Sequence, residues 1–108
     1  MNHEIENFQI LKTIALKLGY TVISVQHGKL NCSKDGKKTF HWNPLIDDGD
    51  CSRLECELGI SVTQGLSLVC AELNPEDEAI VVEFFINYTD KNAAKRVAVV
   101  RCALGYEG

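Results

Sequence analysis

Residues 38–58 read KTFHWNPLIDDGDCSRLECEL, and the chain changes from strand to helix within this stretch. Lys38–Trp42 has the character of a strand, which Pro44 ends because proline cannot donate to a β-ladder. The aspartates of residues 47–50 are typical of a helix start, where carboxylates accept unpaired N–H groups and favour the helix dipole. The spacing predicts a short helix over residues 49–58, with Gly59 as its C-terminal stop.

The segment before this junction predicts one helix and a three-stranded meander. Apolar residues recur at spacings of three and four up to Gly19, which predicts a helix over residues 4–18. Two tight-turn signals, His27-Gly28 and Asp35-Gly36, separate the runs that follow. The predicted strands are Tyr20–Gln26, Leu30–Cys32 and Lys38–Trp42.

The segment after the junction repeats this order. The predicted strands are Ile60–Thr63, Leu66–Leu73 and Ala79–Asn87, and the predicted last helix spans residues 91–104. Thr89 or Asp90 is expected to cap that helix. Ala79–Asn87 is apolar on both faces apart from Glu83, which is typical of a central strand covered on both sides.

The element order is therefore α-βββ-α-βββ-α. Because nearly every link between strands is a hairpin, we expect a largely antiparallel sheet. With helices on both faces, this gives an α+β fold of the α/β/α sandwich type. The length of 108 residues predicts a single domain over residues 1–108.

The five cysteines favour packing over chemistry. They are scattered, odd in number and without a C-x-x-C pair, which argues against a zinc ribbon or a redox motif. The chain has no apolar run of about 20 residues, and its polar start does not resemble a secretory signal. We therefore expect a cytoplasmic protein with no membrane contact and no cofactor.

Charge is distributed unevenly along the chain. Residues 1–42 carry six lysines against three acids, residues 43–83 carry Arg53 against ten acids, and residues 84–108 carry four basic residues against two acids. An acidic surface can engage a basic site on a partner and speed association. The candidate partner contacts are Asp47, Asp48, Glu76, Asp77 and Glu78.

Basic side chains support an alternative reading, in which the chain associates with itself, for example as a homodimer, and regulates nucleic acid. Phosphate contacts require lysine or arginine. The candidates are Lys34, Lys37, Lys38, Lys91, Lys95 and Arg96. A solvated surface is the simpler interpretation of both groups.

A third alternative is a small metal or thiol enzyme that uses His41, Cys51 or Cys56. His41 could ligate zinc together with Cys32 on the adjacent strand, and the helix dipole could lower the pKa of Cys51. The aspartates of residues 47–50 do not match the calcium-loop spacing, so no metal site is assigned. The simpler reading makes the junction structural. Its structural residues are Trp42, Asn43, Pro44, Asp50 and Gly59.

Residues 42–50 read WNPLIDDGD and resemble the W-N-P-L-x-D-D-G-D signature of the phage ABA sandwich domain family, which comprises small bacteriophage and prophage proteins. Leu58-Gly59-Ile60 and the alanine- and arginine-containing residues 93–101 are similar to that family as well. Cys51 and Ser52 depart from the usual D-A-L-R-L, which suggests looser packing or a local use for Cys51.

The resemblance implies a fold, a phage origin and therefore a location inside a bacterial host cell, and it carries over no catalytic residue. The expected function is that of a non-catalytic accessory protein that binds and modulates a host protein or ribonucleoprotein. One example of such a role is the inhibition of a defence complex, as anti-CRISPR proteins do.

Overall fold

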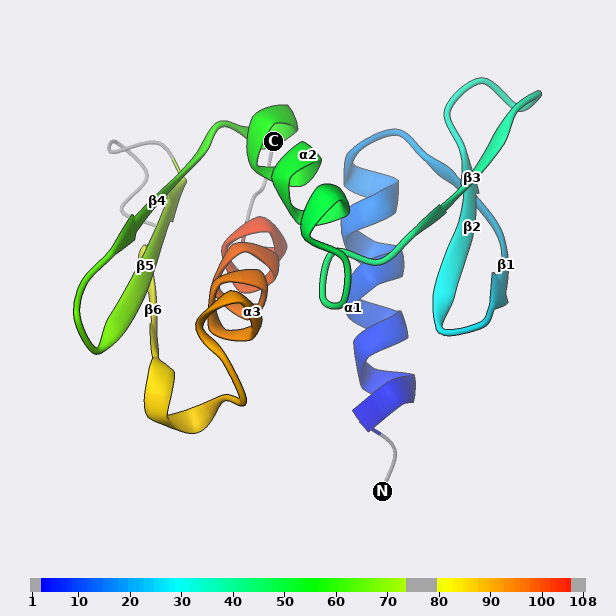
Figure 1. Cartoon of the computed structure of the whole chain (residues 1–108). Coiled ribbons are helices and arrows are strands. Elements are labelled where there is room, and N and C mark those ends of the chain that lie inside the picture. The colour runs from blue at the N-terminus through cyan, green and yellow to red at the C-terminus, as the bar shows by residue number, and fades with distance from the viewer. Residues whose placement is uncertain (1–2, 74–79, 106–108) are drawn as a thin grey trace. The chain divides into compact units, whose positions relative to one another are not determined.

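The structure is a computed structural model, and it describes residues 3–73 and 80–105 (Figure 1). Its element order is α-βββ-α-βββ-α, as expected, and its strands form two separate three-stranded antiparallel sheets. The helices and strands are α1 (His3–Lys17), β1 (Thr21–Gln26), β2 (Lys29–Ser33), β3 (Thr39–Trp42), α2 (Asp48–Leu58), β4 (Ile60–Gln64), β5 (Leu68–Leu73), β6 (Ile80–Phe84), the short 3-10 helix η2 (Phe85–Asn87) and α3 (Lys91–Leu104).

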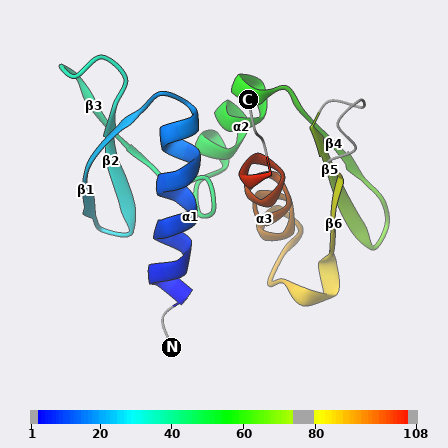
Figure 2. The same cartoon turned by 180° about the vertical axis from the view of Figure 1, so that it is seen from behind.

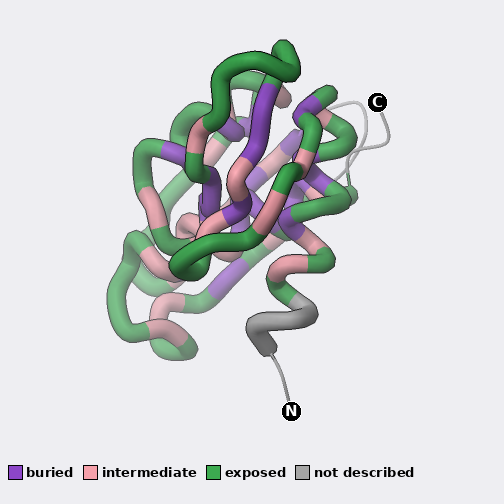
Figure 3. Tube along the Cα trace, turned by 90° about the vertical axis from the view of Figure 1, so that its right-hand side faces the viewer, coloured by how far each residue is buried: buried purple, intermediate pink, exposed green. Residues whose placement is uncertain are grey.

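The chain divides into two compact units, a first unit of residues 1–43 and a second unit of residues 44–107. Each unit holds one meander, ordered β1-β2-β3 in the first and β4-β5-β6 in the second (Figure 2). Exposed residues occupy the turns, and buried residues are concentrated in the helices and strands (Figure 3). The single sheet expected from the hairpin links is therefore replaced by two sheets of three strands.

The first unit is built on the apolar stripe of α1, which packs against β1 and β2. Leu11, Ile14 and Ala15 on this stripe are fully buried. Tyr20 follows the helix and packs edge-on against the ring of Trp42, with 5.8 Å between the ring centroids. Aromatic pairs prefer this edge-to-face geometry, so the end of β3 is held against the start of β1.

Two positive backbone angles close the first hairpin. His27 has a φ of 53° and Gly28 a φ of 78°. Two successive residues with positive φ form a type I′ turn, whose twist matches that of the strands it joins. Asn43 supports this turn from the end of the unit, because its Nδ2 donates to the carbonyl oxygen of Gly28 at 2.8 Å.

The second unit begins with α2 and is completed by α3. The Asp47 side chain accepts a hydrogen bond from the backbone N–H of Asp50, which caps α2, and Gly59 ends that helix in the left-handed conformation. Asp90 caps α3 in the same way by accepting from Ala93. Helix α3 packs against the inner side of the sheet, where Val69 is fully buried.

Strand β6 differs most from its prediction. The structure ends it at Phe84 and continues Phe85–Asn87 as a 3-10 turn. Among the described residues β6 pairs with β5 alone, so it lies at an edge of its sheet and not at the centre, and its outward residues are exposed. Glu83 is the residue of β6 that is buried: Tyr88 Oη donates to its Oε1 at 2.6 Å and Arg101 Nη1 to its Oε2 at 2.9 Å. Burial, followed by this bond to Glu83, raises the pKa of Tyr88 to about 12.

Candidate functional site

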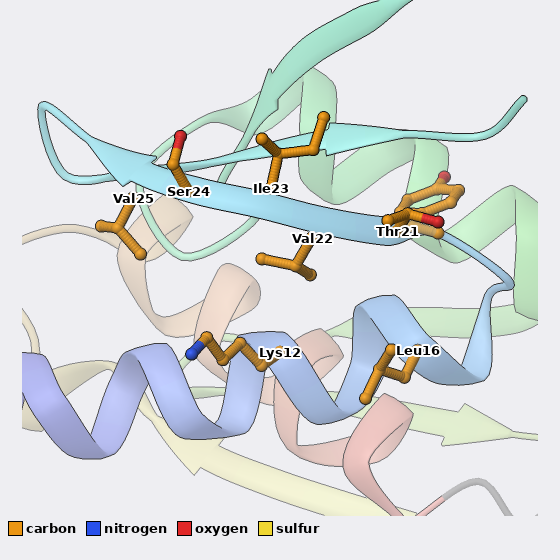
Figure 4. Close-up of a pocket in the computed structure, with 8 residues that line it drawn as sticks. Lys12, Leu16, Thr21, Val22, Ile23, Ser24 and Val25 are labelled. Carbon is orange, nitrogen blue, oxygen red and sulfur yellow. The ribbon is translucent and has the colours of Figure 1, made fainter. Parts of the chain in front are cut away.

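A groove of about 520 Å³ runs between α1 and β1 in the first unit (Figure 4). Lys12 and Leu16 line it from α1, one helical turn apart, and so project from the same side of the helix. The other wall is formed by Tyr20 and by most of β1. Its lining residues there are Tyr20, Thr21, Val22, Ile23, Ser24 and Val25.

Strand β1 is an edge strand of its sheet, since its described pairing is with β2 alone. An edge strand presents a row of backbone N–H and C=O groups that another extended chain can pair with. The register of β1 against β2 shifts between Val22 and Ser24, which makes a bulge at Ile23. Bulges interrupt regular pairing, so this edge suits a short added segment better than a long strand.

Three large apolar side chains at the groove are exposed. Leu16 is 66% exposed, Ile23 54% and Val25 43%. A contiguous exposed apolar patch on a small protein is often a binding site. In Figure 4, Val22 and Val25 point from β1 toward α1, whereas Ile23 and Ser24 point to the other side of the strand.

The sequence reading did not identify this groove. Leu16 lies outside the apolar stripe of α1 and is exposed. A leucine at such a position is the feature of the sequence that could have indicated the groove. Ile23 and Val25 belong to the predicted strand Tyr20–Gln26, whose β-branched residues do not indicate which side chains are exposed. The groove depends on which sheet edge lies beside the helix, and hydrophobic periodicity does not give that information.

One positive charge lies at the groove. Lys12 is exposed and makes no ion pair with any residue that the structure describes. It belongs to the basic first part of the chain, with six lysines against three acids in residues 1–42. The groove therefore combines apolar side chains, an unpaired strand edge and a cationic group.

The acidic candidates are not gathered into one described surface. The Asp47 carboxylate is occupied in capping α2, and Asp48 accepts from Arg96 Nη1 at 2.6 Å. Arg96 is itself largely buried and also donates from Nε to the carbonyl oxygen of Leu45 at 2.8 Å. The other three candidates, Glu76, Asp77 and Glu78, lie outside the described residues.

The basic candidates fall into two groups. Lys34, Lys37 and Lys38 lie in the loop between β2 and β3 of the first unit. Those of the second unit are engaged on α3: Arg96 as described, and Lys95 with Glu55 at 3.4 Å. Lys91 lies 5.3 Å from the ring centre of Phe85. Lys34 of the first unit lies 5.5 Å from the ring centre of Tyr20, so intramolecular partners already engage four of the six proposed phosphate contacts.

The thiol and metal candidates are separated or buried. Cys32 is paired with Phe40 and Asn31 with His41, so Cys32 and His41 point to opposite faces of the sheet. The expectation that they form a shared site is wrong. Among residues 3–73 and 80–105, no three histidine, cysteine or acidic side chains are placed to hold a metal ion.

Burial, and next the carboxylate of Glu55, raises the pKa of Cys51 to about 12, contrary to the lowering expected from the helix dipole. Cys56 is exposed.

The residues assigned a structural role are buried or shape the chain. Trp42, Asn43, Pro44 and Asp50 are buried, and Gly59 ends α2 with a φ of 72°. Asp50 forms an ion pair with Arg53, whose Nη2 donates to Asp50 Oδ1 at 2.5 Å.

Comparison of the chain with protein-family models, curated proteins and solved structures finds no match. Within the described part of the chain, no helix has both the length and the apolar character needed to cross a bilayer. The groove is thus the feature on which a function can be argued.

Proposed function

We propose that this chain is a non-catalytic protein-binding module that captures a short extended segment of a partner in the groove between α1 and β1. The observation that carries the proposal is the apolar groove beside an edge strand. In this mode the captured segment adds a strand next to β1.

Strand addition uses two kinds of contact, and the groove offers both. Backbone groups along the free edge of β1 supply affinity that does not depend on the partner's sequence. Alternate side chains of an added strand point to one side, where Leu16 and Val25 line an apolar surface. Burial of this surface contributes about 25 cal/mol for each Å² removed from water.

The charge at the groove favours a partner segment with an acidic group. Lys12 lies one helical turn before Leu16, so a carboxylate next to an apolar side chain would meet both residues. Complementary charge increases the association rate and selects among partners. The resemblance of residues 42–50 to a phage signature adds the expectation that the partner is a host protein in the cytoplasm.

The test is a binding measurement with synthetic peptides. The probe is a fluorescein-labelled peptide of seven residues that alternates valine with threonine and carries one glutamate, read by fluorescence anisotropy. The same peptide methylated on its backbone amides keeps its side chains and loses its N–H donors. We expect the unmodified peptide to bind and the methylated peptide to lose at least about tenfold in affinity, equal to about 1.4 kcal/mol.

Matched variants of the protein locate the binding site. Val25→Lys places a charge in the groove and should abolish binding, and Lys12→Glu should weaken binding of the glutamate peptide but not of its glutamine counterpart. Val82→Lys on β6 is the control, because Val82 and Val25 are exposed to nearly the same degree, 42% and 43%. Equal binding by the Val25→Lys and wild-type proteins would contradict the proposal.

A further inference from the structure

The second unit carries an exposed apolar surface that the groove does not explain. Strand alternation places Val69 and Ala71 of β5 on the side covered by α3, so that Leu68 and Cys70 point away from α3. The register then aligns Val82 with Cys70 and Phe84 with Leu68 on this outer side. We call the following residues the outer patch: Leu66, Leu68, Ile80, Val82, Phe84 and Ile86.

Two further exposed apolar residues of the patch lie in segments next to the ends of these strands. Leu66 lies in the β4–β5 turn and Ile86 in η2, and the backbone N–H of Phe85 donates to the carbonyl oxygen of Ser67 at 2.9 Å, which holds these segments together. Leu66 is 99% exposed and Ile86 91%. Ile80, Val82 and Phe84 extend the surface along β6 and are about half exposed, at 57%, 42% and 50%.

Strand β6 lacks the features that protect an exposed edge. Natural edge strands carry lysine, proline or a bulge, or are covered by another segment. Residues 80–84 read IVVEF, and they pair with β5 without a bulge. The charge of Glu83 points inward to Arg101, so it does not interrupt the outward row of apolar side chains.

We infer that the outer patch is the interface between two copies of this chain, packed outer face to outer face. The area is sufficient. At roughly 180 Å² per large apolar side chain, the exposed fractions of Leu66, Ile80, Val82, Phe84 and Ile86 amount to about 600 Å² per copy. Complete burial of the patch in a pair would remove at most about 1,200 Å² in total, which reaches the lower end of the range for stable interfaces. Two sheet faces lined by branched and aromatic side chains pack well against each other, as in β-sandwiches.

Charge favours a second copy of this chain, rather than an anionic membrane or a nucleic acid, as the partner of the outer patch. The six residues of the patch are uncharged, and Glu72, which the register places beside Ile80 on the same face, lies at one end of it, so two identical patches can meet largely through apolar side chains. Anionic membranes and nucleic acids attract basic surfaces. Residues 43–83, which include most of this sheet, carry ten acids against one arginine.

The test is the oligomeric state of the full chain, measured by sedimentation equilibrium from 1 to 100 µM. We expect a dimer of about 24 kDa, twice the 12.0 kDa of the chain. Val82→Lys should raise the dimer dissociation constant at least tenfold, whereas Val25→Lys, the matched control on β1, should leave it unchanged. Circular dichroism and the melting temperature establish that each variant is folded, and Ile80→Lys serves as a second patch variant.

Three results would overturn the inference. A wild-type chain that stays monomeric at 100 µM would show that the patch does not pair with itself. Equal dimerisation of the wild-type, Val82→Lys and Ile80→Lys proteins would place the interface elsewhere. A mass that keeps rising with concentration beyond the dimer would indicate open association, not a closed pair. Because the readout is mass and no peptide is present, these outcomes are independent of the groove.

Discussion

Cys51 lies in the first turn of α2, where the helix dipole favours a thiolate, yet its side chain is buried and its Sγ is 3.9 Å from Glu55 Oε2. Burial disfavours the charged form, and the nearby carboxylate disfavours it further. These two effects exceed the dipole, so the pKa is raised to about 12 and the thiol stays protonated at neutral pH. A thiol enzyme built on Cys51 therefore has no nucleophile at neutral pH.

We predict that alkylation separates Cys51 from Cys56. Treatment of the folded protein with iodoacetamide at pH 8 should modify Cys56, which is exposed, and leave Cys51 unmodified, because the reagent needs an accessible thiolate. Peptide mapping by mass spectrometry measures both sites. In 6 M urea both cysteines should react, and modification of Cys51 in the folded protein at the rate of Cys56 would contradict the assignment.

Asp47, at the start of α2, has a structural role as the cap of that helix. Asp47 accepts from the N–H of Asp50 at 3.0 Å, and asparagine can accept the same bond without the charge. We predict that Asp47→Ala lowers the free energy of unfolding by about 1 kcal/mol and that Asp47→Asn lowers it by much less. Urea denaturation at pH 7 provides the measurement. Equal losses for the two variants would show that the charge, not the cap, stabilises the helix.

The elements also show how far the sequence reading reached. The last helix has the bounds predicted for it, residues 91–104, because a capping aspartate and a 3.6-residue apolar stripe are both local signals. Strand β6 was misjudged for a physical reason. A row of apolar residues on both faces is consistent with a central strand, and equally with an edge strand that meets a partner outside the chain. A single sequence does not distinguish these cases.

The same limit applied to the candidate site. His41 and Cys32 were grouped because their strands are adjacent, but side-chain direction depends on register, and a shift of one residue reverses the face. The groove between α1 and β1 joins residues of two elements, and the sequence does not show which sheet edge lies beside a helix. A capping role for an aspartate can be predicted from its position just before a helix, whereas a role in partner contact cannot be predicted from local sequence.

For the whole molecule, the division into two compact units predicts unequal local stability. The first unit comprises about 43 residues and the second about 64. A smaller unit buries a smaller fraction of its surface, so less apolar burial opposes its unfolding. We predict that amide hydrogens of β2 exchange through openings of lower free energy than those of β5, as measured by native-state hydrogen exchange in increasing denaturant. Equal protection of β2 and β5 would indicate a single cooperative unit.

The hydrogen bond from Asn43 to Gly28 has a further consequence for the order of events during synthesis. Every strand of the first sheet pairs with its neighbour in sequence, and Asn43 is the last residue of that unit. The first sheet can therefore close as soon as residue 43 has left the ribosomal exit tunnel, while the strands of the second unit are still inside the tunnel or not yet made. The chain emerges in an order that allows the first meander to finish before the strands of the second become available for mispairing.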